Sequence, residues 1–110
     1  MTTTTRPPSA YEILLAVESA TGIPTRAMLA DNRLHATSHA RFLAMLIYRE
    51  AHPWSSNLDA ALAVGKKDPG TGRHGLMRAA YLLQNDEQFK AAYARAKAIL
   101  SESSSRAARD

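Results

Sequence analysis

Basic side chains and a histidine lie close together between residues 66 and 78, and their chemistry suits contacts to nucleic acid. Two lysines come first, and two arginines and a histidine follow: Lys66, Lys67, Arg73, His74 and Arg78. Lysine and arginine pair with phosphate oxygens, and arginine also donates two parallel hydrogen bonds to guanine. The segment therefore predicts major-groove contacts by Arg73, His74 and Arg78 and phosphate contacts by Lys66 and Lys67.

The positive charge of the chain is concentrated around this segment. The 110 residues carry a formal net charge of +4. Residues 26–78 hold eight basic and four acidic side chains, which accounts for the whole excess, while the flanking parts cancel. Such an excess indicates where an anionic partner binds more than how tightly it binds.

Patterns typical of catalysis, metal binding or nucleotide binding are absent from the sequence. His35 and His39 have the spacing of two zinc ligands on a helix, but no acidic third ligand lies close and the chain has no cysteine. The glycines of residues 65–70 have the spacing of a phosphate-binding loop, but Thr71 and Gly72 follow in place of lysine and serine or threonine. We expect no enzyme activity, no cofactor, no metal and no bound nucleotide.

Helical periodicity runs through the chain between its two polar ends, so the sequence predicts an all-α domain of five or six helices. Ser9 with Glu12 and Ser56 with Asp59 have the spacing of capping boxes, which start helices. Trp54 lies between two predicted helices and is expected in or over the core, with base stacking as the alternative. The expected helices span residues 9–21, 25–29, 38–51, 56–64, 73–84 and 86–100, with Asn85 as the cap of the last.

The order of elements in residues 55–83 is that of a helix-turn-helix. A short capped helix is followed by a glycine, a basic loop over residues 66–72 and a second helix, on which Met77, Ala80 and Tyr81 are expected to face inward. In this motif the second helix enters the DNA major groove. The alternative is a pair of ordinary helices joined by a solvated loop.

The ends of the chain are expected to be disordered tails, over residues 1–8 and 101–110, around one domain at residues 9–100. No apolar stretch is long enough to cross a membrane, and the start of the chain lacks the apolar segment of a secretory signal. These features predict a cytoplasmic, nucleoid-associated protein.

Residues 40–50, Ala-Arg-Phe-Leu-Ala-Met-Leu-Ile-Tyr-Arg-Glu, form the most specific motif of the chain. They are similar to the Ala/Pro-Arg-x-x-Ala-Met-x-Leu-Ala-Arg/Lys-Glu helix of the C-terminal DNA-binding domain of the bacterial replication initiator DnaA, and residues 13–100 as a whole resemble that domain. Residues 21–29, 56–65 and 85–89 also resemble, in order, the family's early glycine turn, first helix of the pair and final helix cap. The resemblance implies a fold like that of DnaA domain IV and the Trp repressor.

The resemblance also implies DNA-contact roles for particular residues. It implies that Arg33 enters the minor groove and that Arg41 and Arg49 contact phosphates. Ser56, at the start of the first helix of the pair, is a further phosphate candidate. The family's nucleotide-binding part has no counterpart here, so the chain is expected to be a stand-alone protein or an excised domain.

The chain departs from the family where the family contacts bases. The family's turn is Gly-Gly-Arg/Lys-Asp-His-Thr-Thr-Val, whereas here Gly65 is followed by a longer loop and by Arg73 and His74, with Gly75 and Leu76 in place of the threonine pair. The leading hypothesis is a protein that binds double-stranded DNA, at a DnaA-box-like or diverged site, in replication initiation or transcriptional regulation. The alternative is an adaptor that keeps the fold, has lost base contacts and binds a protein of those machineries.

Overall fold

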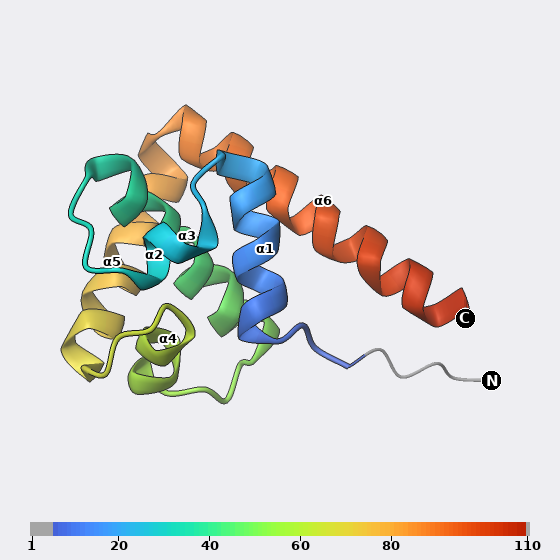
Figure 1. Cartoon of the computed structure of the whole chain (residues 1–110), viewed down its shortest axis with the longest axis horizontal. Helices are drawn as coiled ribbons and strands as arrows, with labels where there is room; N and C mark the ends of the chain where they lie inside the picture. Colours follow the sequence, from blue (N-terminus) through green and yellow to red (C-terminus); the bar gives the residue numbers. More distant parts are fainter. Residues whose placement is uncertain (1–5, 110) are drawn as a thin grey trace.

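The computed structural model describes residues 6–109, with side chains as far as Ser103, and folds them into six α-helices without a strand (Figure 1). This confirms the all-helical class expected from the sequence. The helices are α1 (Ala10–Thr21), α2 (Thr25–Leu29), α3 (His35–Ala51), α4 (Asn57–Ala63), α5 (Pro69–Asn85) and α6 (Glu87–Arg109).

Capping boxes start two of the helices where the sequence predicts them. The Ser9 hydroxyl accepts a hydrogen bond from the Glu12 amide, and the Glu12 carboxylate accepts one from the Ser9 amide. Ser56 and Asp59 make the same reciprocal pair at the start of α4. Each pair satisfies two amides that the helix itself leaves without acceptors, and this fixes where the helix begins.

The third helix, α3, is the central element, because it contacts all five of the others. Its apolar side chains pack with those of α1 in one core, in which Leu43, Met45 and Ile47 are fully buried beside Ile13 and Val17. Helices α1 and α6 pack together, as do α4 and α5. The second half of α6 extends past the rest of the molecule (Figure 1). The pair α4–α5 lies at the other end of the view.

The boundaries of α3, α5 and α6 differ from those expected. Helix α3 begins at His35 and not at Ser38, because the Leu34 carbonyl accepts the Ser38 amide and closes an earlier turn. Asp86, and not Asn85, caps α6, with its carboxylate accepting the Phe89 amide. Helix α6 also continues to Arg109 through the expected C-terminal tail. Once a helix is nucleated, each added residue gains a hydrogen bond without needing a buried side chain.

At the N-terminus, residues 1–5 of the expected tail lie outside the described part of the chain. The next residues contact the domain: the Arg6 guanidinium pairs with the Glu12 carboxylate at 2.9 Å. The His52 Nε2 donates to the Pro8 carbonyl at 2.7 Å. The described part of the tail is therefore held against the ends of α1 and α3.

Candidate nucleic-acid interface

Helices α4 and α5 are joined by a short turn that carries the two lysines. Gly65 turns the chain with φ 76°, a left-handed conformation that glycine adopts without strain. The Lys66 amide donates back to the Ala61 carbonyl of α4 at 2.9 Å. Lys67 is exposed at the tip of the turn. Both lysines are therefore held just before the N-terminus of α5.

Helix α5 begins four residues earlier than expected, which corrects the long loop assigned to residues 66–72. Asp68 caps the helix by accepting the Gly70 amide at 3.1 Å, and Pro69 occupies the first helical position. Proline suits that position because its ring fixes a helical φ and no amide is lost. The Asp-Pro signal thus outweighs Gly70 and Gly72, whose low helix propensity had favoured a loop.

Two glycines set the rotation of α5 about its own axis. A Cβ atom on Gly72 would lie 1.9 Å from the Asn57 carbonyl oxygen at the start of α4, and one on Gly75 would lie 2.1 Å from the Met45 side chain of α3. The backbone of α5 therefore lies directly against both neighbours along this face. Ala79 and Leu82 continue the same buried face.

The inward-facing residues expected for α5 are wrong as a consequence. Met77 is 62% exposed and Tyr81 is 56% exposed, and Ala80 also faces solvent. The buried face is formed largely by glycine and alanine, which give a weak apolar signal in the sequence. The larger Met77 and Tyr81 side chains suggested the opposite face.

The three residues expected to face the major groove all lie on α5, in its second and third turns. Arg73 and His74 are exposed. The His74 ring also meets the Phe42 ring of α3 edge-on, at 5.8 Å between centroids. Arg78 is half-buried, with its guanidinium carbon 5.1 Å from the centre of the Tyr81 ring. Their base contacts stay predictions.

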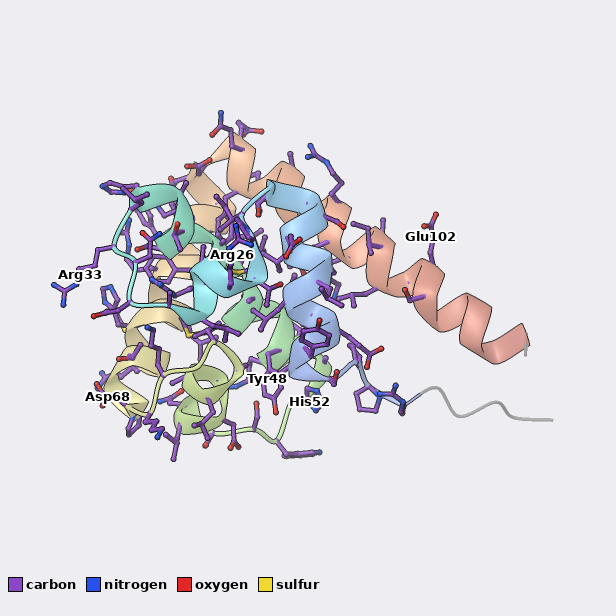
Figure 2. The ribbon with its side chains drawn as sticks, in the orientation of Figure 1. Arg26, Arg33, Tyr48, His52, Asp68 and Glu102 are labelled. Atoms are coloured by element: carbon purple, nitrogen blue, oxygen red, sulfur yellow. The ribbon has the colours of Figure 1, made fainter. Side chains whose placement is uncertain are left out.

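The loop that carries Arg33 lies beside the lysine turn. The Lys66 ammonium donates to the Ala30 carbonyl at 3.2 Å. Leu29 also lies against Gly65, where its side chain would be 3.1 Å from an added Cβ. Arg33 points away from the body of the molecule, on the same side as Asp68 and far from Glu102 of α6 (Figure 2). The loop that carries Arg33 and the turn that carries Lys66 and Lys67 therefore lie side by side, before the start of α5.

Arg49 and Ser56 lie close to each other at the start of α4. The Arg49 Nη2 donates to the Asn57 side-chain oxygen at 3.0 Å, while its buried Nε has no hydrogen-bond partner. The Asp59 carboxylate accepts the Ser56 amide, and this hydrogen bond holds the pKa of Asp59 below its ordinary value. A negative charge thus accompanies the two phosphate candidates.

Arg41 is the phosphate candidate whose position fits its expected role least. Only 9% of the residue is exposed, and its guanidinium donates to the carbonyls of Met28 and Ala30, both at 2.6 Å, and to that of Ala27 at 3.2 Å. Burial lowers the pKa of this guanidinium, and the charge of Asp31 opposes that shift. The Nε and Nη2 donors of Arg41 thus hold the end of α2 against α3, which leaves little of the side chain exposed for the expected phosphate contact.

Trp54 is the residue whose exposure differs most from the expectation. It is 98% exposed in the connection between α3 and α4, two residues before the Ser56 cap. The expectation of a core or lid position is therefore wrong. Its polar neighbours and its place outside both apolar helix stripes were the signals of exposure in the sequence.

The two histidines with the spacing of zinc ligands lie on α3. His35 and His39 do share a helix, with ring centroids 5.7 Å apart. Within the described residues, however, no group of three histidine, cysteine or acidic side chains could hold a metal ion. The same part of the chain holds no helix long and apolar enough to pass through a membrane.

Comparison with known proteins adds no identification to this geometry. No protein-family model, curated protein or solved structure gives a match to the chain.

Proposed function

We propose that this protein binds double-stranded DNA, with α4, the lysine turn and α5 acting as a helix-turn-helix. In this motif the second helix lies in the major groove while the first crosses the phosphate backbone. Arg73 and His74 then face base edges from α5, and Lys66, Lys67 and Arg49 contact phosphates. Arg33 reaches the adjacent minor groove from its own loop.

The observation that carries the proposal is that the turn with Lys66 and Lys67 lies against the loop of Arg33 and directly precedes α5, the helix of Arg73 and His74. The hydrogen bond from the Lys66 ammonium to the Ala30 carbonyl joins this loop to the turn. A partner that spans both regions needs a regularly spaced anionic surface. The phosphates on the two sides of a DNA groove provide one.

The resemblance to the C-terminal domain of DnaA supports the same proposal from the sequence side. The short turn agrees with it better than the long loop expected from the sequence, since only residues 64–68 separate α4 from α5. We therefore propose a role at DNA in replication initiation or transcriptional regulation, with Arg41 excluded from the contact surface.

The test is a fluorescence anisotropy titration of labelled random-sequence duplex DNA at low salt. We expect a dissociation constant of tens of micromolar or tighter, weakening steeply as salt is added. Lys67→Ala should lower the affinity for every sequence and reduce the salt dependence by about one ion per complex.

Lys90→Ala is the matched control for that variant. Lys90 carries the same charge on α6, next to the opposite end of α5, about 24 Å along that helix from the lysine turn. Its loss should leave the affinity and its salt dependence nearly unchanged. Equal effects of Lys67→Ala and Lys90→Ala, or no binding by the wild-type protein, would contradict the proposal.

A second candidate function is a protein-interaction adaptor, and the exposed apolar residues around α4 favour it. Trp54 is almost fully exposed, and Leu58 and Leu62, one turn apart on α4, are also exposed. Exposed aromatic and aliphatic side chains of this kind often mark protein contacts. The adaptor predicts that Trp54→Ala abolishes recovery of a protein partner in a pull-down while duplex DNA binding is weak and sequence-blind.

A further inference from the structure

The outer face of α5 has the spacing of a base-contacting surface and includes a residue that the sequence analysis placed in the core. Gly70, Arg73, His74 and Met77 are all exposed, and they follow one another at i, i+3, i+4 and i+7. These intervals place the four positions on one face over two helical turns, with side chains from Arg73, His74 and Met77 and none from Gly70. The same intervals separate the base-contacting residues of the homeodomain recognition helix.

The contacts on the buried side of α5 fix which of its residues face outward. Gly72 lies against the Asn57 carbonyl and Gly75 against Met45, on the opposite side of the helix. Turning α5 to hide Met77 would require both close contacts to be broken. A Cβ on Gly70, in contrast, would make only an ordinary contact of 3.4 Å with the Asp68 carboxylate, so the first turn has room on this side.

Met77 is a large apolar side chain that is 62% exposed on this face. An unbranched thioether of this length is flexible and apolar, and it adapts to small apolar groups. In the major groove of unmodified DNA the C5-methyl group of thymine is the apolar group on the base edges. Arg73, one turn earlier, supplies the guanidinium that donates to guanine.

We propose that Met77 is a specificity-determining residue that contacts a thymine methyl group, beside a guanine contacted by Arg73. This inference rests on the proposed DNA binding through α5. It assigns no base contact to Arg78, which is half-buried with its guanidinium over the Tyr81 ring. The DNA sites preferred by the protein therefore contain a guanine and a thymine within the few base pairs that two helical turns cover.

The experiment begins with selection of binding sites from a random duplex pool by the wild-type protein. Each thymine of the selected duplex is then replaced, one at a time, by deoxyuridine, which removes only the methyl group. We expect one replacement to weaken wild-type binding about fourfold, the effect of roughly one buried methyl group.

Variants of the protein test whether the effect of removing the thymine methyl group depends on Met77. Met77→Ala should bind the selected duplex with about fourfold lower affinity and be insensitive to the same replacement. Met77→Leu, which keeps an apolar side chain of similar size, should remain sensitive. Gln84→Ala, on the exposed side of α5 two turns farther along, is the matched control and should behave as the wild-type protein does.

The outcomes separate this inference from the proposed function. If the wild-type protein selects a motif but no thymine shows a methyl effect that depends on Met77, the inference is overturned while DNA binding stands. The inference is also overturned, and DNA binding stands, if the protein binds duplex DNA without enriching any motif. The inference is likewise overturned if Met77→Ala disrupts only a protein contact. No binding to any duplex overturns the proposed function itself.

Discussion

Replacing Gly72 by alanine tests the contact that fixes α5 against α4. Alanine normally stabilises a helix relative to glycine by up to about 1 kcal/mol. Here the new Cβ would lie 1.9 Å from the Asn57 carbonyl oxygen, whereas ordinary contacts begin at 3.4 Å. The two helices must therefore separate by about 1.5 Å, and both sides of the contact are backbone.

The cost of that separation is that of overpacking a core, about 1–3 kcal/mol or more. We expect Gly72→Ala to lower the free energy of unfolding by about 2–3 kcal/mol, net of the gain in helix propensity. Gly75→Ala should cost less, because the atoms it displaces belong to the flexible Met45 side chain. Urea unfolding followed by circular dichroism measures both values.

Gly70→Ala is the matched control, since its added Cβ would meet nothing closer than 3.4 Å. It should leave the stability unchanged or raise it by up to about 1 kcal/mol. If Gly72→Ala proves as stable as Gly70→Ala, then α5 does not lie against α4 as described. The rotation of α5, and with it the outward position of Met77, would then be refuted.

Three further predictions concern other contacts of the fold. Arg41→Met should lower the free energy of unfolding by about 3 kcal/mol, because carbonyls at the end of α2 lose a charged donor. A urea titration measures this, and an unchanged free energy of unfolding would mean that Arg41 does not hold α2. Burial and the hydrogen bond to Glu50 raise the pKa of Tyr93 to about 12, above its ordinary value of 10. The stability from this group is therefore full below pH 10 and lost as the pH rises toward 12; thermal melts of Tyr93→Phe should lack that part of the decline. Ser9→Ala should cost about 1 kcal/mol in urea unfolding through loss of the α1 cap, and no change would contradict the reciprocal bonding seen there.

The sequence predicted the elements that depend on local signals. The capping boxes at Ser9 and Ser56 start helices because they satisfy amides a few residues away, and such contacts are visible in the order of the residues. The central position of residues 38–51 was also predictable, because that segment is apolar on most sides.

The sequence could not predict the rotation of α5 or the state of Arg41. Glycine carries no apolar side chain, so the buried face formed around Gly72 and Gly75 gives no periodic signal, although the Gly72 backbone lies directly against the Asn57 carbonyl of α4. Arg41 finds its acceptors on α2, thirteen residues earlier in the case of Met28, and only tertiary packing brings them together.

The most direct test of the central claim is to map, by NMR, which amides respond when duplex DNA is added to the labelled protein. DNA binding through the helix pair predicts chemical-shift changes at residues 57–59, 66–77 and around Arg33, and little change in the second half of α6. Loss of these shifts in Lys67→Ala, but not in Lys90→Ala, would locate the contact at the turn. Shifts confined to α1 and α6, or none at any ratio of DNA to protein, would contradict the account.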